Sequence, residues 1–444
     1  MMNWHQLISN KRLGQEDQHY QKKDDRTEFH RDYDRLIFSS PFRRLQNKTQ
    51  VFPLPGSIFV HNRLTHSLEV ASVGRSLGDD VAHRLLMKHD ELKDSHIMEC
   101  GAIVSAACLA HDMGNPPFGH SGERAIAAFF AEGAGQKYQS LLTDDQWNDL
   151  IHFEGNANAF RLLTHQFEGR REGGFVMTYS TLASIVKYPF PSNQAGNKQK
   201  FGFFQSEIET YRKIANELGI ILLNQNEDQP HYARHPLVYL VEAADDICYE
   251  IMDIEDAHKL KILSSEQTKQ LLLDYFDKER QAQMQEVLKR VTDLNEQIAY
   301  LRSCCIGALE AACVQVFVEN EESILSGTFE SSLIKRLEGR IGEAYQKCED
   351  ASYGHIYRSK DVVDIELAGY KIISTLIDLF TTAAMNPDAA YSRLLLERVS
   401  KQYSVHSENV YERIMSVLDY ITGMTDVYAL DLFRKINGES IPII

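Results

Sequence analysis

The sequence lacks several features that would define a protein class. It has seven cysteines, an odd number, and none of them forms a CxxC pair, so neither a disulfide framework nor a zinc–thiolate site is indicated. The first residues lack the apolar core of a secretory signal. The longest strongly apolar run, near residues 102–110, is too short to span a bilayer. We therefore expect a reduced, cytoplasmic location and no membrane partner.

Positive charge is also scarce. The chain has 47 Lys and Arg residues against 63 Asp and Glu residues, a net charge of −16. This balance argues against a protein whose main role is non-specific binding to nucleic acid. A small basic pocket for a phosphate ligand is still allowed, because net charge does not determine the local field. No strand-rich region, repeat or low-complexity segment is evident, and the expected fold class is all-α.

The chain divides into three parts by composition. Residues 1–30 are polar and charge-rich, and we expect a loosely packed N-terminal arm. Residues 31–260 carry the motifs described below and are predicted to form the catalytic core. Residues 261–444 repeat long amphipathic patterns, and we expect a helical C-terminal region that packs with the core.

The most informative stretch runs from His111 to Glu123. It follows an apolar helix predicted over residues 98–110, whose last turn delivers His111 and Asp112. A buried carboxylate is costly unless it is paired or bound to a metal ion, so stability alone does not explain this helix end. Pro116 and Pro117 then stop the helix and start a new one. The stretch predicts the floor of a metal-dependent hydrolase site.

Two residues on other predicted helices complete a candidate metal site. His66 lies three residues after Arg63 on a helix that starts near residue 62, and Asp245 lies on a helix predicted over residues 237–252. Two His and two Asp side chains suit Mn²⁺, Fe²⁺, Mg²⁺ or Zn²⁺ without choosing among them. They leave positions for water and a phosphoryl oxygen. The alternative is that His66 is structural, as a lone histidine on an apolar helix usually is.

Two further patterns place chemical groups on shared helix faces. His120 and Glu123 are three residues apart, and a carboxylate beside an imidazole raises its basicity and fixes its orientation, as a general base requires. A surface ion pair is the alternative. Asp245, Tyr249 and Asp253 recur every four residues and line one stripe of their helix. A solvated face is the alternative there, although the helix is otherwise apolar.

These stretches together resemble the HD phosphohydrolase superfamily and, within it, the deoxyguanosine triphosphate triphosphohydrolases. The H…HD…D pattern of the superfamily matches His66, His111-Asp112 and Asp245. The resemblance covers residues 26 to 260, approximately. The narrower match is carried by residues 42–52, 61–70, 111–123, 152–157 and 239–246.

The resemblance implies an all-helical HD-domain core with additional C-terminal helices and a hexameric assembly. It implies that water attacks the α-phosphorus of a deoxynucleoside triphosphate and releases the deoxynucleoside and intact triphosphate. The implied ligands of a divalent metal ion (Mn²⁺, Mg²⁺ or Fe²⁺) are His66, His111, Asp112 and Asp245. The implied catalytic residues are His120, Glu123 and His152. The implied substrate-binding residues are Arg63 and Lys200 for phosphates, and Gln46, Tyr249 and Asp253 for the sugar.

Some alternatives stay open at this point. Lys187 and Lys198 compete with Lys200 for the phosphate role. The protein is alternatively another HD-superfamily enzyme, such as a nucleotidase, cyclic-nucleotide phosphodiesterase or alarmone hydrolase. It is alternatively a nucleotide or single-stranded nucleic-acid-binding protein with little turnover, against which the intact pair of His120 and Glu123 argues. An effector nucleotide and single-stranded DNA are further partners that the resemblance suggests.

Overall fold

The computed structural model describes residues 1–16, 24–52, 60–196, 199–224, 226 and 228–440. Within these ranges every regular element is a helix, and β-type pairing is limited to three isolated bridges, one of them between Thr49 and Asn62. The all-α prediction is therefore confirmed. Local sequence signals set helix starts. For example, α4 (Arg63–Lys88) begins with a capping box formed by Asn62 and Thr65.

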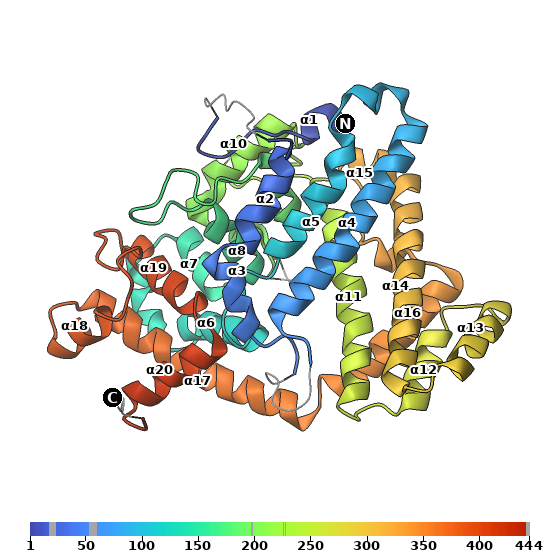
Figure 1. Cartoon of the computed structure of the whole chain (residues 1–444). Coiled ribbons are helices and arrows are strands. Elements are labelled where there is room, and N and C mark those ends of the chain that lie inside the picture. Colours follow the sequence, from blue (N-terminus) through green and yellow to red (C-terminus); the bar gives the residue numbers. More distant parts are fainter. Residues whose placement is uncertain (17–23, 53–59, 197–198, 225, 227, 441–444) are drawn as a thin grey trace.

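Three long helices form the centre of the molecule. The helices α4, α5 (Cys100–Ala110) and α11 (Val238–Lys259) pack against one another (Figure 1). Gly78 of α4 lies against Gly101 of α5 so closely that a Cβ atom on Gly78 would lie 2.7 Å from the Gly101 Cα. α11 continues beyond its predicted end near residue 252, and Asp253 therefore lies on this helix.

The described residues bury two separate hydrophobic clusters, which we call the first core and the second core. The first core surrounds α4, α5 and α11. Its other helices are α1 (Trp4–Leu7), α2 (Glu28–Ile37), α3 (Ser40–Arg44), α9 (Tyr179–Ile185), α10 (Ile208–Leu218), α12 (Ser265–Leu273), α13 (Lys278–Arg290), α14 (Leu294–Glu319), α15 (Glu321–Ser326) and α16 (Gly339–Ala351). The second core is formed by α6 (His120–Ala131), α7 (Asp144–Ile151), α17 (Lys360–Met385), α18 (Ala390–Leu396), α19 (Val410–Thr422) and α20 (Asp426–Ile436).

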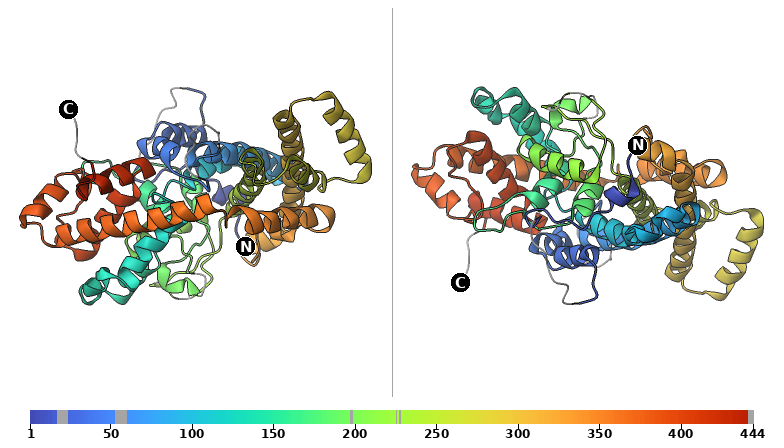
Figure 2. Two further views of the ribbon diagram at one scale, coloured as in Figure 1. Left: turned by 90° about the horizontal axis from the view of Figure 1, so that it is seen from below. Right: turned by 90° about the horizontal axis from the view of Figure 1, so that it is seen from above.

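The two cores meet around the middle of the chain. α8 (Gly155–Thr164) contributes Phe160 to the first core and Ala157 to the second core. Residues 261–444 do not form one lobe, because α12 to α16 join the first core and α17 to α20 build most of the second. The long helix α17 packs along α6, while α12 and α13 project at the opposite end of the molecule (Figure 2).

The first residues of the chain are not the loosely packed arm that their composition predicts. Trp4 and Leu7 are buried, and the Trp4 Nε1 donates a hydrogen bond to Glu321 Oε1 at 3.1 Å. Arg12 is also buried, and its guanidinium lies 2.6 Å from the carboxylate of Asp32. Residues 1–30 are polar on average, which favours a loosely packed arm, but the few apolar side chains among them, such as Trp4 and Leu7, are buried.

One helix of the described residues, α14, is long and apolar enough to cross a membrane by length and composition, and it is longer than the apolar run at α5. A third of its most apolar window, 33%, is buried inside the molecule. Its buried side chains, such as Leu301 and Phe317, pack in the first core against α4 and α11. Core helices of soluble proteins pass the same test, so this single helix is weak evidence for a membrane span.

Candidate active site

The candidate site is a cavity of about 350 Å³ between the ends of the central helices and the start of α6. Many of the residues singled out in the sequence line it. Those predicted residues are Arg63, His111, Asp112, His120, Glu123, Lys200, Asp245 and Tyr249. The cavity therefore joins residues that lie far apart in the sequence.

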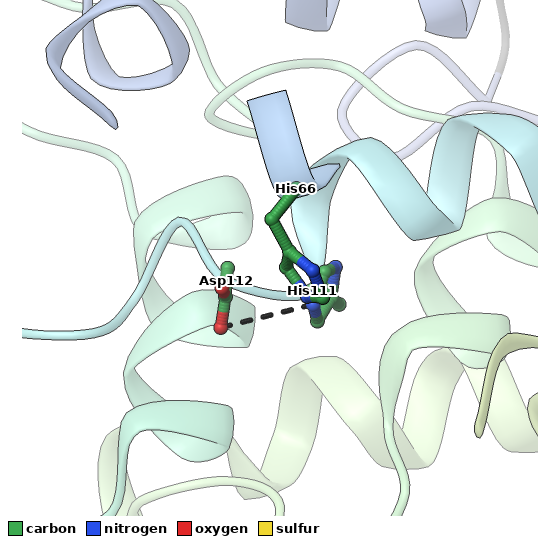
Figure 3. Close-up of side chains that lie close together, drawn as sticks. All are labelled: His66, His111 and Asp112. Atoms are coloured by element: carbon green, nitrogen blue, oxygen red, sulfur yellow. Dashed lines mark ion pairs between the residues drawn. The ribbon is translucent and has the colours of Figure 1, made fainter. Parts of the chain in front are cut away.

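The ligand cluster consists of His66, His111, Asp112 and Asp245, and all of these except His66 line the cavity. His66 comes from α4, and His111 and Asp112 follow the end of α5, so that potential ligand atoms of all three lie within 4.8 Å of one another (Figure 3). Asp245 comes from α11, and its Oδ1 lies 3.0 Å from His66 Nε2 and 3.5 Å from His111 Nε2. The structure thus brings the four predicted metal ligands together.

The state of His111 fits a metal ligand. Its Nδ1 lies 2.6 Å from the Cys108 carbonyl oxygen and must donate to it, so the neutral ring that binds a metal would have its lone pair on Nε2. That Nε2 atom is buried and has no hydrogen-bond partner among the described residues. It faces Asp112 Oδ1 at 3.7 Å, the contact drawn in Figure 3. A carbonyl that fixes the ring in this tautomer is the usual arrangement behind a metal-binding histidine.

The charges around His111 favour a cation. Burial lowers the pKa of this imidazole, but the carboxylates of Asp112 and Asp245 outweigh burial and raise it to about 9. In the same way burial acts to raise the pKa of Asp245, but His111 and His66 hold it well below its usual range. Two carboxylates that stabilise a protonated imidazole in a buried site would also stabilise a divalent ion. The four residues therefore fit such an ion.

His120 and Glu123 form an acid–base pair at the start of α6. The Glu123 Oε2 lies 3.0 Å from His120 Nδ1, and this hydrogen bond raises the pKa of the imidazole. Burial acts to raise the pKa of Glu123, but His120 holds it below its usual value. The other oxygen, Oε1, accepts a hydrogen bond from the Gly155 backbone N–H at 3.1 Å. The buried carboxylate is therefore fixed by two bonds. His120 lines the cavity with a largely exposed side chain, and its Nε2 is not used by this pair.

The backbone just before His120 is bent sharply. Phe118 has a φ of 63° and Gly119 a φ of 55°, both in the left-handed region. A side chain at Gly119 would strain this bend, and a Cβ atom there would lie 2.6 Å from an Arg63 guanidinium nitrogen. Glycine at this position lets Arg63 reach the ligand cluster, where its Nη1 lies 2.7 Å from Asp112 Oδ2.

The basic side chains on the cavity wall are held by acids. Lys200 Nζ lies 2.6 Å from Glu154 Oε2, and Lys187 Nζ lies 3.0 Å from Glu242 Oε1. Both lysines line the cavity, while Lys198 lies outside the described residues. Glu154 is a site residue that the sequence reasoning missed, although it belongs to a stretch that had been singled out. An anionic ligand would compete with these acids for the two ammonium groups.

A stacked pair of tyrosines continues from the far end of the cavity. Tyr249 lines the cavity and stacks on Tyr357 with ring centroids 6.0 Å apart and planes at 24°. The Tyr357 hydroxyl donates to Asp253 Oδ2 at 2.8 Å. Burial raises the pKa of Asp253 well above its usual value. Tyr357 directly follows a π-helical turn, Ser352–Ile356, in the C-terminal region and carries no motif that would have identified it.

Four predicted site residues do not line the cavity. His66 is buried within the ligand cluster, and Asp253 is buried one turn beyond Tyr249 on α11. The other two, Gln46 and His152, lie elsewhere. Gln46 is exposed and does not line the cavity, whereas Gln50 does, because residues 45–47 form a 3₁₀ turn that points Gln46 to solvent. The Gln50 Oε1 is buried with no hydrogen-bond partner among the described residues. His152 ends α7, is half-buried and also lies outside the lining, where Glu154 and Asn156 of the same stretch are found instead.

Two family models match the chain. The model described as "HD domain" matches residues 63–172, which include three of the four residues in the ligand cluster and the acid–base pair. The model described as "Phosphohydrolase-associated domain" matches residues 336–435, which include Tyr357 and most of the second core. The fold and the site therefore define an HD-domain phosphohydrolase.

Curated relatives extend over the whole chain. A deoxyguanosinetriphosphate triphosphohydrolase-like protein of Pseudomonas aeruginosa is 38% identical over 459 residues, which cover 99% of this chain and 100% of the relative. One from Synechocystis is 36% identical with the same coverage. A deoxyguanosinetriphosphate triphosphohydrolase of Yersinia enterocolitica is 30% identical over 92% of this chain and 93% of its own. The chain belongs to the deoxyguanosine triphosphate triphosphohydrolase family.

Proposed function

We propose that this protein hydrolyses deoxynucleoside triphosphates to the deoxynucleoside and intact triphosphate. The observation that carries the proposal is that one cavity is lined by three residues of the ligand cluster, the acid–base pair, two lysines and a tyrosine ring, with the fourth cluster residue, His66, in contact with Asp245. Names of relatives that act on deoxyguanosine triphosphate support the same substrate class. In the reaction, a bond forms between a water oxygen and the α-phosphorus, and the bond from that phosphorus to the sugar O5′ breaks.

His66, His111, Asp112 and Asp245 would hold a divalent ion, which when bound polarises a phosphoryl oxygen and orients the ester. Mn²⁺, Mg²⁺ and Fe²⁺ all suit this set of nitrogen and oxygen ligands. Arg63 lies between Asp112 and Gly119, so its guanidinium reaches a phosphate that lies next to the ligand cluster. Its charge would stabilise the negative charge that grows on the phosphoryl oxygens in the transition state.

His120 acts as the general base in this proposal. The Glu123 carboxylate fixes the ring and leaves Nε2 to accept the proton of the attacking water. The resulting imidazolium is stabilised by the same carboxylate. The proton is then available for the O5′ of the departing deoxynucleoside, so no charge is left on that product.

Lys200 and Lys187 would bind the outer phosphates. Each exchanges its present acidic partner, Glu154 or Glu242, for phosphate oxygens when the highly charged triphosphate enters. Release of Glu154 leaves a carboxyl whose pKa is already raised by burial and by Glu123. Protonation of this carboxyl removes like-charge repulsion from the phosphate chain.

The sugar would lie on the Tyr249 ring. This ring is stacked on Tyr357, whose hydroxyl is hydrogen-bonded to Asp253, so the stacking restrains the ring on that side. A 2′-hydroxyl would crowd it, which favours deoxyribose. We assign the polar contact with the sugar to Gln50 in place of Gln46, because the Gln50 Oε1 is buried at the cavity and has no partner among the described residues.

The test is a substrate panel. The purified protein is incubated with each of the four deoxynucleoside triphosphates, and with the ribonucleotides as controls, in Mn²⁺ or Mg²⁺. We expect deoxynucleoside and triphosphate, and ¹⁸O from labelled water in the triphosphate alone. Release of a deoxynucleoside diphosphate with phosphate, or of a deoxynucleoside monophosphate with pyrophosphate, would contradict the release of intact triphosphate.

The resemblance also leads us to propose a homohexamer and an effector nucleotide. Light scattering of the purified protein measures the assembly directly. Deoxynucleotides supplied in pairs test the effector, because a substrate that is cleaved only in the presence of a second nucleotide reveals activation. Binding of a fluorescent single-stranded DNA to the same preparation tests the remaining predicted partner.

A further inference from the structure

The candidate active site lies where the two hydrophobic cores meet. The helices that carry the ligand cluster, α4, α5 and α11, belong to the first core. The helix that carries the acid–base pair, α6, packs its apolar face in the second core. The distance between the cluster and His120 therefore depends on how residues 113–119, which connect Asp112 to α6, are held between the cores.

Asp426 contacts both sides of this junction. It is the first residue of α20 in the second core and is only 5% exposed. Its Oδ1 accepts the backbone N–H of Phe118 at 2.9 Å, inside the bend that precedes His120. Its Oδ2 accepts the backbone N–H of Thr49 at 2.8 Å and also the Thr49 hydroxyl. Thr49 is the neighbour of the cavity residue Gln50.

Lys48 makes a second connection in the same place. This lysine is 2% exposed, and its Nζ donates to the Asn115 carbonyl oxygen at 2.6 Å and to the Thr422 carbonyl oxygen at 2.8 Å. Thr422 ends α19, four residues before Asp426. Asn115 in turn donates a short side-chain hydrogen bond to Asp112. Both ends of the connecting segment are thus fixed by polar groups from outside it.

The bend needs such support. Phe118 is not a glycine, so its positive φ is unfavourable and persists only where the surroundings impose it. α17 closes the bend from the other side. Gly369 lies against the Phe118 side chain, and the Ser121 hydroxyl donates to the Glu366 backbone carbonyl oxygen at 2.6 Å. Among the described residues, it is Asp426 that accepts the hydrogen bond from the Phe118 backbone N–H.

We propose that Asp426 is a positioning residue for the hydrolytic reaction: its two carboxylate oxygens fix the Phe118 bend against the Thr49 segment and so set His120 opposite the ligand cluster. The proposal rests on the proposed function for its kinetic consequence. Its structural content, that Asp426 holds the bend, is measurable without any turnover.

Asp426→Asn is the sharpest variant. The variant keeps the shape of the side chain but has one accepting oxygen in place of two. The amide NH₂ group must then face the backbone N–H of either Phe118 or Thr49, and that hydrogen bond is lost. Asp431→Asn is the matched control, because Asp431 lies on the same helix, is 45% exposed and, within the part of the chain that the structure describes, pairs with Lys435 alone. Lys48→Met removes the other connection and provides an independent variant if Asp426→Asn does not fold.

Three quantities are measured on each variant: the kcat and KM for deoxynucleotide hydrolysis, the bound metal per subunit, and amide hydrogen exchange over residues 113–120. For Asp426→Asn we expect a fall in kcat of roughly 10- to 100-fold, since small misplacement of a catalytic group has that effect. KM and metal content should stay at wild-type values, and exchange over residues 113–120 should be faster. Lys48→Met should change the same quantities in the same direction, and Asp431→Asn should change none.

The outcomes separate this inference from the proposed function. Wild-type kcat and wild-type exchange in Asp426→Asn would overturn the positioning role while leaving the hydrolase intact. A fall in kcat that comes with lost metal or unchanged exchange would assign Asp426 to general stability and overturn it as well. If the wild type cleaves no deoxynucleotide, the proposed function fails, and the exchange data alone still decide whether Asp426 holds the bend.

Discussion

The first and second cores contribute different chemistry to one cavity. The first core supplies the ligand cluster from three helices that pack directly on one another, so its geometry follows from the central packing of the molecule. The second core supplies the acid–base pair from one helix, α6, and the backbone bend at Phe118 and Gly119 sets where this helix starts at the cavity. Metal affinity should therefore depend on the first core, and the rate of the chemical step on how the second core is attached.

Asp245→Ala tests the first-core half and should have the largest effect. It removes a carboxylate that lies near both His66 and His111, which leaves the site with one acid to balance a divalent charge. We expect metal affinity to fall at least about 100-fold and hydrolysis to be lost with it. Loss of a residue that only hydrogen-bonds to a metal ligand already lowers affinity by up to about 100-fold. Metal analysis by mass spectrometry checks this. Full metal content in the variant would remove Asp245 from the ligand set.

His120→Ala tests the second-core half. The rate should fall by roughly two to four orders of magnitude, the usual contribution of general-base catalysis, while the metal stays bound. His152→Ala is the matched comparison, because the structure places this other predicted histidine outside the cavity lining. Its kcat should stay near the wild-type value. A large loss in His152→Ala with little loss in His120→Ala would reverse the two assignments.

The pH dependence of hydrolysis sharpens the same comparison. Glu123 raises the pKa of His120, and a general base works only when it is deprotonated, so the rate should fall as the pH drops through that raised pKa. Glu123→Gln removes the charge that favours the imidazolium, so the acidic limb should move to lower pH. Rate–pH profiles at saturating substrate check the direction of the shift. A limb that moves to higher pH would contradict the pairing.

Tyr357→Phe should have the smallest effect. It removes the hydroxyl that donates to the buried Asp253 and leaves the stacked ring in place. An unsatisfied buried acceptor costs about 1–3 kcal/mol, so the free energy of unfolding should fall by that amount in urea titrations. Discrimination between deoxyribonucleotides and ribonucleotides should weaken only slightly, because the Tyr249 ring keeps its neighbour. Unchanged stability would show that Asp253 finds another donor.

The comparison also shows which parts of the site could be predicted from the sequence. The ligand cluster was predictable because a buried helix that ends in His111-Asp112 has no stabilising explanation except pairing or a metal ion. The acid–base pair followed from helical spacing of His120 and Glu123. Local sequence pointed to His111, Asp112 and the pair of His120 and Glu123, whereas the family resemblance joined His66 and Asp245 to them.

Other parts depend on tertiary packing and could not be predicted. The choice between Gln46 and Gln50 depends on a 3₁₀ turn that places one side chain in solvent and the other in the cavity. Tyr357 and Asp426 lie more than 100 residues after Asp245, in a region whose sequence shows only helical character. Their roles arise from the way α16 to α20 pack against the first half of the chain, which a local pattern does not encode.

The π-helical turn at Ser352–Ile356 has a consequence for how substrate selectivity evolves. An extra residue in one turn advances everything after it by about 100° around the helix axis relative to an α-helical register. Deletion of the single residue Gly354, whose Cβ position is open space, would restore ordinary winding and rotate the Tyr357 hydroxyl away from Asp253. A one-codon deletion more than 100 residues after Asp245 would then loosen the stacked Tyr249 ring, to which we assign the selection of deoxyribose, without changing any residue of the ligand cluster or the acid–base pair.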